Sequence, residues 1–597
     1  MYRSRNIRMI ATMYGFLAIF VVWVALLLAP YVATRDLLLA NAADALSHPL
    51  RISLCKNTPR CVLIFLLVYG LAVLTYETNR KNYRRKEEHG SAKWGDPRAL
   101  RRELAVKTYA ENRLLTANVR MGYDGHVHQR NLNTLVIGGA GSGKSRYYVK
   151  PNLMQGNTSY VVLDPKGELL RDVGGLLVKR GYRLRVLDLH DMEKSHGYNP
   201  FVYLRNDTDI QQLVTNIFKS TAPREAVTQD PFWDNAAAML LKALIFYLHY
   251  EAPPEEQNFA MIMEMIRYGE VRDGDEEYRS ALDLLFDELA AREPFHPAVK
   301  AYRNYRSGAA DTLKSIQITL ISRLEKFDLD AMAKLTMTDE LDLPRMGSEK
   351  TALFAVIPDD DTSFNFLVTI LYMQLFQELY EQADRVYGGR LPVPVHFLMD
   401  EFANVALPND FDKLLATMRS REISVSIIIQ NAAQLKALFK DSWESIRGNC
   451  DEFLYLGGNE FSTHKMISEM LDKETIDTNT YGRSHGRNGS YSTNDQNSGR
   501  ELLTPGEVSL LPKTHAILFV KGARPILDQK YPLLRHPNIK DTVDGGAPPY
   551  RHGVCPVGQT LSLPKESTVA AGDLPELMPN PHYELLADEE IEAFYAA

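Results

Sequence analysis

Two long runs of apolar residues set the N-terminal part of the chain apart from the rest. Residues Met9–Ala33 carry no charged side chain, and a second, shorter apolar run covers Cys61–Tyr76. Because an α-helix rises ~1.5 Å per residue, the first run can cross the hydrocarbon core of a bilayer, whereas the second is near the lower limit. The pattern predicts a membrane anchor over residues 1–86, with spans at about 9–33 and 60–77. A buried hairpin in a soluble protein is the alternative.

Basic residues flank both apolar runs. Those before the first run are Arg3, Arg5 and Arg8, and those after the second are Arg80, Lys81, Arg84, Arg85 and Lys86. Lysine and arginine accumulate on the cytoplasmic side of membrane segments. The flanks therefore predict a multi-pass protein of the cytoplasmic membrane whose remaining body lies in the cytoplasm. Basic residues in the loop between the runs, at about 35–60, weaken this bias without reversing it.

Beyond residue 86, short apolar segments alternate with helical patterns. The apolar segments are Thr134–Ile137, Tyr160–Asp164, Leu184–Leu187, Ala352–Ile357, Val395–Met399, Ser424–Gln430 and Ala516–Val520. Several are rich in Val and Ile without polar alternation, as in strands that are buried on both faces. Strands that alternate with helices favour an α/β domain whose mostly parallel sheet is covered by helices. We expect this domain to comprise residues 87–205 and 346–540.

Residues 206–345 differ because strand patterns disappear and helical spacing dominates. Apolar residues recur at helical spacing in two sets, which are Leu282, Leu285, Phe286 and Leu289, and Leu313, Ile316, Leu320 and Leu324. The change predicts an all-helical lobe inserted into the α/β domain. Its segment Glu251–Glu293 is strongly acidic. This charge fits either a solvated helix surface or a docking face for a basic protein partner.

Two further segments bury little apolar surface. The tract Thr478–Gly499 is polar, and the chain beyond about Asp541 is rich in Pro and Gly and ends in acidic residues. Such segments are expected to remain mobile. We interpret the tract as a mobile loop or linker, and residues 541–597 as a flexible C-terminal tail or partner contact.

Composition narrows the class of protein. The 597 residues are 45% hydrophobic and 24% charged, as in globular proteins and unlike disordered ones. The formal net charge of −7 does not suggest a basic nucleic-acid coat protein, although local patches can still bind DNA. The four cysteines show no C-x-x-C spacing and no accompanying His/Cys cluster, which argues against a zinc site or a disulfide framework.

The strongest chemical motif follows the segment Thr134–Ile137. It comprises Gly138, Gly139, Ala140, Gly141, Ser142, Gly143, Lys144 and Ser145. It matches the phosphate-binding loop G-x-x-x-x-G-K-[ST] in the strand–loop–helix context that this motif requires. Glycines allow the tight turn that points successive N–H groups at phosphate oxygens, and the following helix adds partial positive charge. Lys144 is expected to reach the β- and γ-phosphates of ATP, and Ser145 to bind Mg²⁺.

A phosphate-binding loop of this kind needs an acidic partner on a nearby strand. Asp400 and Glu401 directly follow the apolar segment Val395–Met399. We expect Asp400 to hold Mg²⁺ through the water shell of the ion, and Glu401 to act as the general base toward the attacking water. Two acidic residues after a strand are common by chance, so the pair indicates this chemistry only together with the glycine-rich loop.

Other residues are candidates for contacts with a nucleotide. Gln430 ends its apolar segment, where multi-subunit motors often place a polar residue that senses the γ-phosphate. Arg419 or Arg421 could be an arginine finger that reaches the nucleotide of a neighbouring subunit, with a surface ion pair as the alternative. Lys166, within Asp164–Glu168, follows a strand end, where open α/β sheets bind ligands. A plain Pro-Gly turn explains that motif equally well.

Together these pieces resemble the TraG/TraD-type coupling proteins of conjugative type IV secretion. The matching stretches are His89–Pro97, Gly138–Ser145, Leu163–Leu169, Leu398–Val405, Met418–Asn431 and Glu501–Val508, besides the two N-terminal spans. The resemblance covers nearly the whole chain to about Asn538, and it is closest to the branch on mobile elements of Gram-positive bacteria.

The resemblance implies a RecA-like P-loop ATPase that forms a homo-hexamer at the cytoplasmic membrane. Its partners would be DNA, bound as a single strand with little sequence preference, the relaxase or relaxosome, which the helical lobe contacts, and components of the secretion channel. ATP hydrolysis would drive transfer. Carried onto this sequence, Lys144 and Ser145 bind the nucleotide, and Asp400 and Glu401 are the acidic pair. Arg419 is then the first choice for the finger and Arg421 the second, and Gln430 is the sensor.

Two other functions are compatible with the motifs. An FtsK-like chromosomal DNA translocase shares the motor, but it usually carries more membrane spans and a DNA-reading domain at its end. The C-terminal tail here lacks a basic recognition-helix pattern. A non-motor docking receptor, in which ATP only drives assembly, would have no use for a catalytic Glu401.

Overall fold

A computed structural model of the chain describes residues 7–31, 47, 49–50, 52–79, 87, 89–222, 231–271, 278–358, 360–402, 411–483 and 491–553. Contacts divide the chain into two units. One unit consists of residues 1–91 and 473–500, and the other of residues 92–472 and 501–597. The two units are described separately below.

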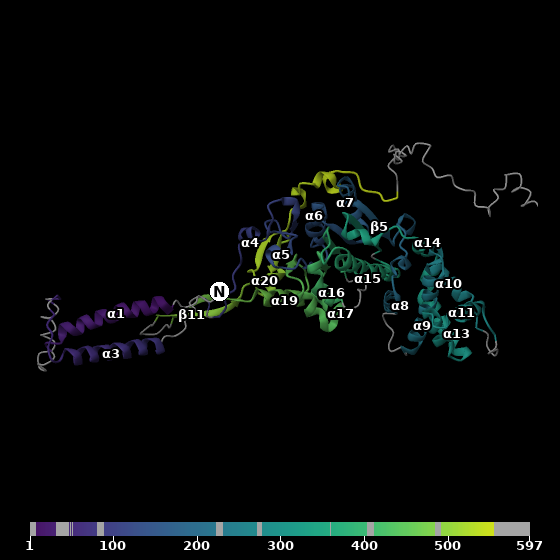
Figure 1. Ribbon diagram of the computed structural model, residues 1–597. Coiled ribbons are helices and arrows are strands. Elements are labelled where there is room, and N and C mark those ends of the chain that lie inside the picture. The colour runs from purple at the N-terminus through teal and green to yellow at the C-terminus, as the bar shows by residue number, and fades with distance from the viewer. Residues whose placement is uncertain are drawn as a thin grey trace, which may run out of the picture. The chain divides into compact units, whose positions relative to one another are not determined.

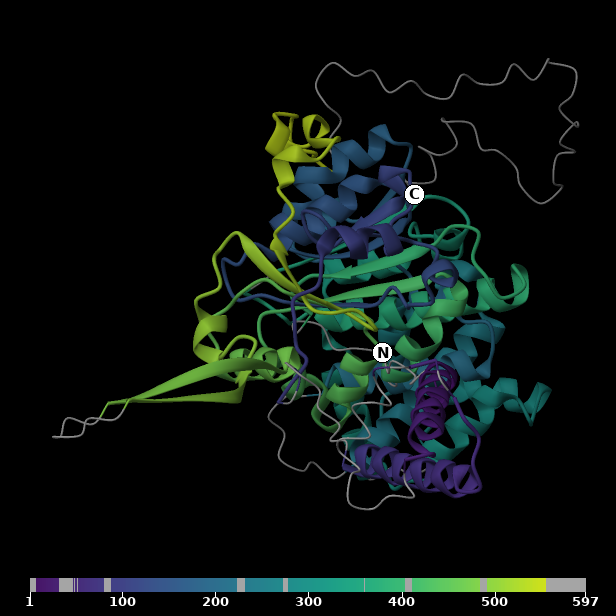
Figure 2. The same ribbon diagram turned by 90° about the vertical axis from the view of Figure 1, so that its left-hand side faces the viewer.

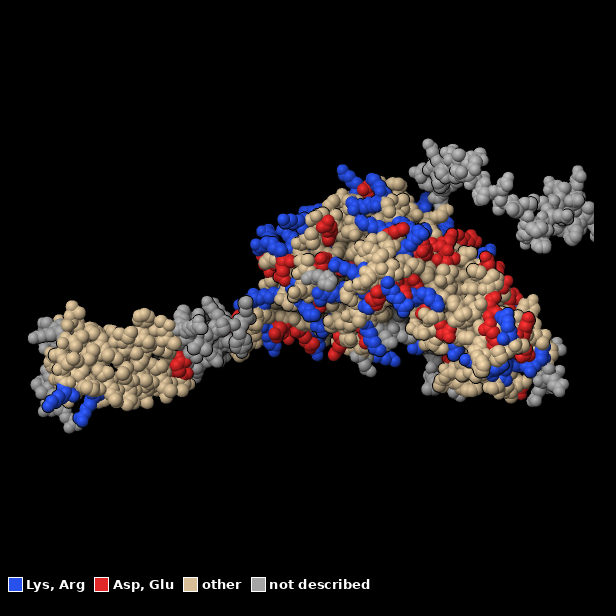
Figure 3. Space-filling view, in the orientation of Figure 1, with Lys and Arg blue, Asp and Glu red and all other residues tan. Residues whose placement is uncertain are grey.

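The first unit contains two apolar helices, α1 (Ile7–Leu28) and α3 (Thr58–Asn79), which pack side by side (Figure 1). Both are long and apolar enough to cross a membrane, and most of their visible surface carries no charged side chain (Figure 3). Helix α3 is longer than the predicted span, because it continues through polar residues. In this extension the Thr78 hydroxyl donates to the carbonyl oxygen of Leu74, one turn earlier. The predicted basic flanks at 1–6 and 80–86 lie outside the described residues.

The polar tract Thr478–Gly499 is not a linker throughout, contrary to the prediction. Most of its residues belong to β10 (Lys473–Arg483) and β11 (Tyr491–Glu501), which pair in a two-stranded sheet (Figure 2). Thr and Tyr favour extended backbone, and a two-stranded ribbon has no sheet core that aliphatic side chains must fill. The shortage of aliphatic residues therefore did not exclude strands. Residues 484–490 lie outside the described residues.

The second unit is built on a nine-stranded sheet with the order β13-β12-β9-β3-β8-β7-β4-β6-β5. The strands are β3 (Thr134–Ile137), β4 (Ser159–Pro165), β5 (Arg183–Asp188), β6 (Thr351–Ile357), β7 (Val395–Met399), β8 (Ile423–Ile429), β9 (Glu452–Tyr455), β12 (His515–Val520) and β13 (Ile526–Gln529). All pairings are parallel except those of β12, which runs antiparallel to β9 and β13. The predicted α/β class and its mostly parallel sheet are confirmed.

Helices cover both faces of this sheet (Figures 1 and 2). They are α4 (Pro97–Leu104), α5 (Gly125–His128), α6 (Lys150–Gln155), α7 (Glu168–Lys179), α15 (Asn365–Glu381), α16 (Phe411–Thr417), α17 (Ala432–Phe439), α18 (Trp443–Gly448), α19 (Phe461–Leu471) and α20 (Pro505–Ser509). Along β4, Val161 and Leu163 enter the core that α15 to α20 share, whereas Tyr160 and Val162 enter the core under α4, α6 and α7. Burial on both faces explains why the strands lack polar alternation.

Between β5 and β6 the described regular elements are all helical. They include α8 (Asp207–Ser220), α9 (Pro231–Glu251), α10 (Phe259–Arg267), α11 (Ala281–Arg292), α12 (Pro297–Arg306), α13 (Ala310–Leu324) and α14 (Asp330–Met337). The predicted apolar faces of α11 and α13 are buried, apart from the half-buried Leu285. In the acidic segment, Asp287 and Glu288 are exposed, while residues 272–277 lie outside the described residues. The described elements of this stretch are helical, as the spacing predicted, and its division from the α/β domain as a separate lobe stays a prediction.

The segment after residue 540 begins as part of the folded body, which corrects the predicted start of the flexible tail. Short helical turns at Ile539–Asp541 and Val543–Gly545 pack on α7. Asp541 forms an ion pair with Lys179 at 2.5 Å, and the backbone N–H of Tyr550 donates to the Arg171 carbonyl at 2.9 Å. Pro and Gly in this stretch shape turns that such contacts hold in place. Residues 554–597 lie outside the described residues.

Candidate active site

The glycine-rich loop leaves the carboxyl end of β3 and borders a cavity of about 340 Å³. Gly141 and Gly143 have φ angles of +72° and +83°, in the left-handed region that glycine adopts without steric cost. The Lys144 side chain is buried, and its Nζ donates to the carbonyl oxygen of Gly138 at 3.1 Å. The cavity is lined by Gly141, Gly143, Lys144, Ser145, Arg146, Lys150, Asp164, Pro165, Lys166, Glu168, Leu169, Asp400 and Glu401.

The helix that follows the loop begins as a π-helical turn. This turn covers Ser145–Val149, and the N–H of Lys150 bonds to the carbonyl of Ser145, five residues earlier. Pro151 follows in α6 and has no N–H with which to continue an α-helical ladder. Sequence reasoning predicted a helix here but not its wider first turn. Such turns are often found at functional sites.

Strand order brings the acidic pair to the loop. Asp400 follows β7, which is separated from β3 only by β8, and the Ser145 hydroxyl donates to Oδ2 of Asp400 at 2.5 Å. Burial raises the pKa of Asp400, while the Ser145 hydrogen bond and the Lys144 charge act in the opposite direction. Glu401 also lines the cavity, and its φ angle of +50° is unusual for a residue with a Cβ. Strained backbone of this kind clusters at functional sites.

The Asp164–Glu168 motif combines the two roles that its sequence left open. The Asp164 carboxylate accepts the N–H groups of Leu169 and Leu170 at 3.1 and 2.7 Å, and so caps the start of α7. Burial raises its pKa to about 7. Lys166 adopts a turn conformation with φ of +71° and also lines the cavity. The motif is therefore a turn that places a lysine beside the glycine-rich loop.

Gln430 and the two arginines lie at different ends of β8. Gln430 follows the strand, at the same sheet edge as Asp400, but it does not line the cavity. Arg419 and Arg421 precede the strand. Arg421 forms a bidentate ion pair with Asp384 at 2.9 and 2.7 Å, as the ion-pair alternative predicted. Arg419 donates to a backbone carbonyl at 3.0 Å and has no ion pair with a described residue.

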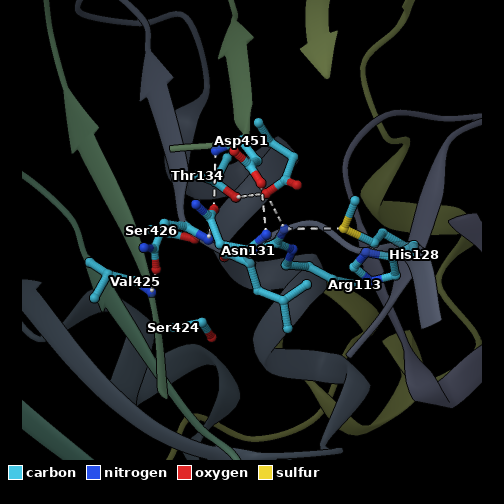
Figure 4. Close-up of polar contacts among 12 residues, drawn as sticks. Arg113, His128, Asn131, Thr134, Ser424, Val425, Ser426 and Asp451 are labelled. Carbon is cyan, nitrogen blue, oxygen red and sulfur yellow. Dashed lines mark hydrogen bonds and ion pairs between the residues drawn. The ribbon is translucent and has the colours of Figure 1, made fainter. Parts of the chain in front are cut away.

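The opposite ends of the same strands hold a closed polar cluster (Figure 4). Arg113, on β1 (Asn112–Leu114), and Glu452 of β9 are fully buried and form an ion pair at 2.6 Å. The Thr134 hydroxyl at the start of β3 also donates to Glu452, at 3.4 Å. Burial raises the pKa of Glu452 to about 7, against the effect of Arg113. β1 pairs with β2 (Arg120–Gly122) beside the main sheet.

A buried hydrogen-bond chain links this end of the sheet to the π-helical turn. The Tyr148 hydroxyl bonds to Ser426 Oγ at 2.7 Å, and Ser426 in turn bonds to His396 Nε2 at 2.9 Å. Ser424 bonds to the other ring nitrogen at 2.6 Å. Burial lowers the pKa of His396 well below its usual range. A neutral imidazole donates from one nitrogen and accepts at the other, so the two serine hydroxyls take complementary roles.

Sequence reasoning missed several basic residues around the cavity. Arg146 and Lys150 line it, and Lys150 bridges Asp172 and Asp544 at 2.5 and 3.0 Å. Their positions directly after the motif were a usable signal. Lys530, whose Nζ reaches the Ser142 carbonyl at 2.9 Å, follows a strand nearly 400 residues away and had no local signal.

The mostly parallel sheet, its helical cover and the glycine-rich loop beside a buried carboxylate together define an α/β protein with a candidate nucleotide-binding site. Residues 99–544, about three quarters of the chain, match the family model described as "Type IV secretory system Conjugative DNA transfer". The chain belongs to this family. The assignment to a Gram-positive branch remains a prediction.

Known proteins agree with this assignment. VirD4 of Agrobacterium fabrum is 21% identical over 74% of this chain and 66% of its own length, and TraG of Escherichia coli is 24% identical over 74% of each. The chain thus spans just under two thirds of that VirD4. Among solved structures, the unbound conjugative coupling protein TrwBdeltaN70 has a TM-score of 0.52 and 17% identity, covering 75% of this chain and 94% of its own. TrwB in complex with ADP and Mg²⁺ has a TM-score of 0.51 and 15% identity, covering 74% and 93%.

Proposed function

We propose that this protein is a membrane-anchored ATPase that couples ATP hydrolysis to the transfer of relaxase-bound DNA through a type IV secretion channel. The hydrogen bond between Ser145 and Asp400 is the observation that carries the proposal. A hydroxyl and a carboxylate at 2.5 Å present hard oxygen ligands to one point, beside a loop suited to phosphates. The ADP and Mg²⁺ in the TrwB complex support this choice of ligand.

Each residue of the cavity has a proposed role. Lys144 would contact the β- and γ-phosphates, and the backbone N–H groups of Gly138–Ser145 would cradle them. Ser145 and Asp400 would hold Mg²⁺, which supplies charge neutralisation between the phosphates. Glu401, which lines the cavity, would orient and deprotonate the attacking water. Gln430 would sense the γ-phosphate from the neighbouring strand end.

The position of the arginines supports the proposed assembly. Arg419 precedes β8, so it lies at the opposite sheet edge from the cavity of its own chain. An arginine there can assist only the nucleotide of another subunit, which supports a ring such as a homo-hexamer. We prefer Arg419 to Arg421 as the finger, because Arg421 is already committed to Asp384 and stacks 4.3 Å from the Tyr380 ring centre.

The remaining parts have proposed roles by location. Residues 1–86, with α1 and α3, would anchor the protein in the cytoplasmic membrane as a multi-pass segment, and the ATPase body would lie in the cytoplasm. Residues 87–205 and 346–540 would form the motor, which acts on single-stranded DNA without sequence preference. The helical lobe at 206–345 would dock relaxosome proteins. Further partners would be components of the secretion channel.

The test is the Lys144→Ala variant in ATP turnover and in DNA transfer between cells. Loss of the lysine should abolish ATP hydrolysis and transfer, since it removes the charge at the β- and γ-phosphates, while membrane insertion stays normal. Lys513→Ala is the matched control, because Lys513 is an exposed lysine of the same unit. Normal transfer by Lys144→Ala would refute the motor. Wild-type protein that binds ATP but never hydrolyses it, with single-stranded DNA present, would favour the docking receptor.

A further inference from the structure

Lys530 lies behind the phosphate-binding loop, on the outside of the cavity. It directly follows the edge strand β13, and its backbone N–H donates to the Thr514 carbonyl at 2.8 Å. Its side chain runs to the loop, where Nζ donates to the carbonyl oxygen of Ser142 at 2.9 Å. The ammonium also lies 5.3 Å from the ring centre of Tyr147, in the π-helical turn. The residue is only 6% exposed.

This lysine is buried without a counter-charge. It forms no ion pair with any residue that the structure describes. Burial alone lowers its pKa, to about 8. Burying an unpaired cation costs free energy, so contacts that merely stabilise the fold are a poor explanation for its position. An unneutralised positive charge beside a phosphate-binding loop instead suits a polyanionic ligand.

The contact with Ser142 fixes the orientation of one peptide group. The described chain has no cis peptide bond, so the Ser142 carbonyl and the Gly143 N–H point in opposite directions across a planar group. Holding the carbonyl toward Lys530 therefore keeps the Gly143 N–H turned to the other side. Gly143 lines the cavity, and because glycine has no Cβ its backbone alone does not fix the orientation of this peptide.

We propose that Lys530 is a positioning residue of the phosphate site, which locks the Ser142–Gly143 peptide so that the Gly143 N–H is pre-oriented for a nucleotide phosphate. The inference rests on the proposed nucleotide-binding function. Lys530 follows the edge strand β13 and would contact the loop and not the phosphate itself.

The experiment measures the dissociation constant of a fluorescent ATP analogue with Mg²⁺ for the full-length protein in detergent. Lys530→Met removes the donor and the charge, and should weaken binding about tenfold, as expected for a lost charged hydrogen bond. Lys530→Arg retains both and should bind within about threefold of the wild type. Lys513→Met, which removes an exposed lysine near Thr514, is the matched control and should bind normally.

The outcomes separate this inference from the proposed function. If the wild type and Lys513→Met bind no nucleotide, the proposed function fails and the inference fails with it. If they bind and Lys530→Met binds equally well, only the inference is refuted. Circular dichroism checks the fold of each variant. Should Lys530→Met not fold, Lys530→Arg decides alone: a folded arginine variant with wild-type affinity supports the inference, and tenfold weaker binding contradicts it.

Discussion

The two ends of the central sheet treat polar groups in opposite ways. At the carboxyl ends of β3, β4 and β7, charged side chains surround an open cavity, and Lys166 and Glu401 have left-handed backbone. At the other ends, Arg113 and Glu452 are fully buried and form an ion pair at 2.6 Å, while Arg113 Nε and Glu452 Oε1 have no hydrogen-bond partner among the described residues. In the local sequence pattern, only the direction of the strands distinguishes one end of the sheet from the other.

This difference distinguishes polar groups that are available to bind a ligand from polar groups that stabilise the fold. A buried ion pair helps to specify a fold, and a ligand cannot reach it without opening the core. Charged and polar groups that line an open cavity, by contrast, can bind a ligand. By this criterion the carboxyl ends of the strands, at Ser145 and Asp400, form the candidate active site, which we call the chemical edge. The opposite ends of the strands, shown in Figure 4, stabilise the fold, and we call them the structural edge. The predictions below separate the two edges by experiment.

The largest expected effect is on turnover at the chemical edge. Glu401→Gln removes the proposed general base and should lower ATP turnover by roughly 10²- to 10⁴-fold. Affinity for the nucleotide and thermal stability should stay near wild type, because the side chain keeps its size and faces the cavity. Steady-state turnover and nucleotide binding, measured on the same preparation, check this. Unchanged turnover would remove Glu401 from the mechanism.

The next effect is on stability at the structural edge. Glu452→Ala leaves the Arg113 guanidinium buried and without its partner, which should destabilise the fold by about 3–5 kcal/mol. Denaturant unfolding followed by circular dichroism measures the loss. The double variant Arg113→Met with Glu452→Leu should recover most of it, since a buried pair can often be replaced by apolar residues. A Glu452→Ala protein as stable as wild type would contradict the closed-cluster interpretation.

The smallest effect is the pH dependence of nucleotide affinity. Lys530 has a pKa of about 8, and a bound polyphosphate favours its protonated form. The charge is present below that pH and is lost above it, so affinity should fall severalfold as the pH rises through about 8. Lys530→Arg stays charged and should flatten this decline. Titration of binding in both proteins checks the prediction, and parallel curves would exclude Lys530 as the source.

Local sequence pattern determines much of the secondary structure of this protein. Apolar runs without alternation located seven strands of the central sheet, the change to helical spacing located the inserted lobe, and the motif at 138–145 located the loop. These features depend on neighbours within one element, where period and turn chemistry are written directly in the residues. Strands β9 and β13 were missed, because β9 begins with the buried charge of Glu452 and β13 ends in the polar residues Asp528 and Gln529.

Only the tertiary structure decided which distant residues meet. Ser145 and Asp400 are 255 positions apart, and Ser142 and Lys530 are 388 apart. Their contacts follow from the strand order β3-β8-β7 and from the antiparallel edge that carries β13. Residues 541–553 likewise lie on α7 through an ion pair and a backbone hydrogen bond that composition could not predict. Sequence pattern records how each segment is buried, whereas the packing of all segments together decides what lies beside it.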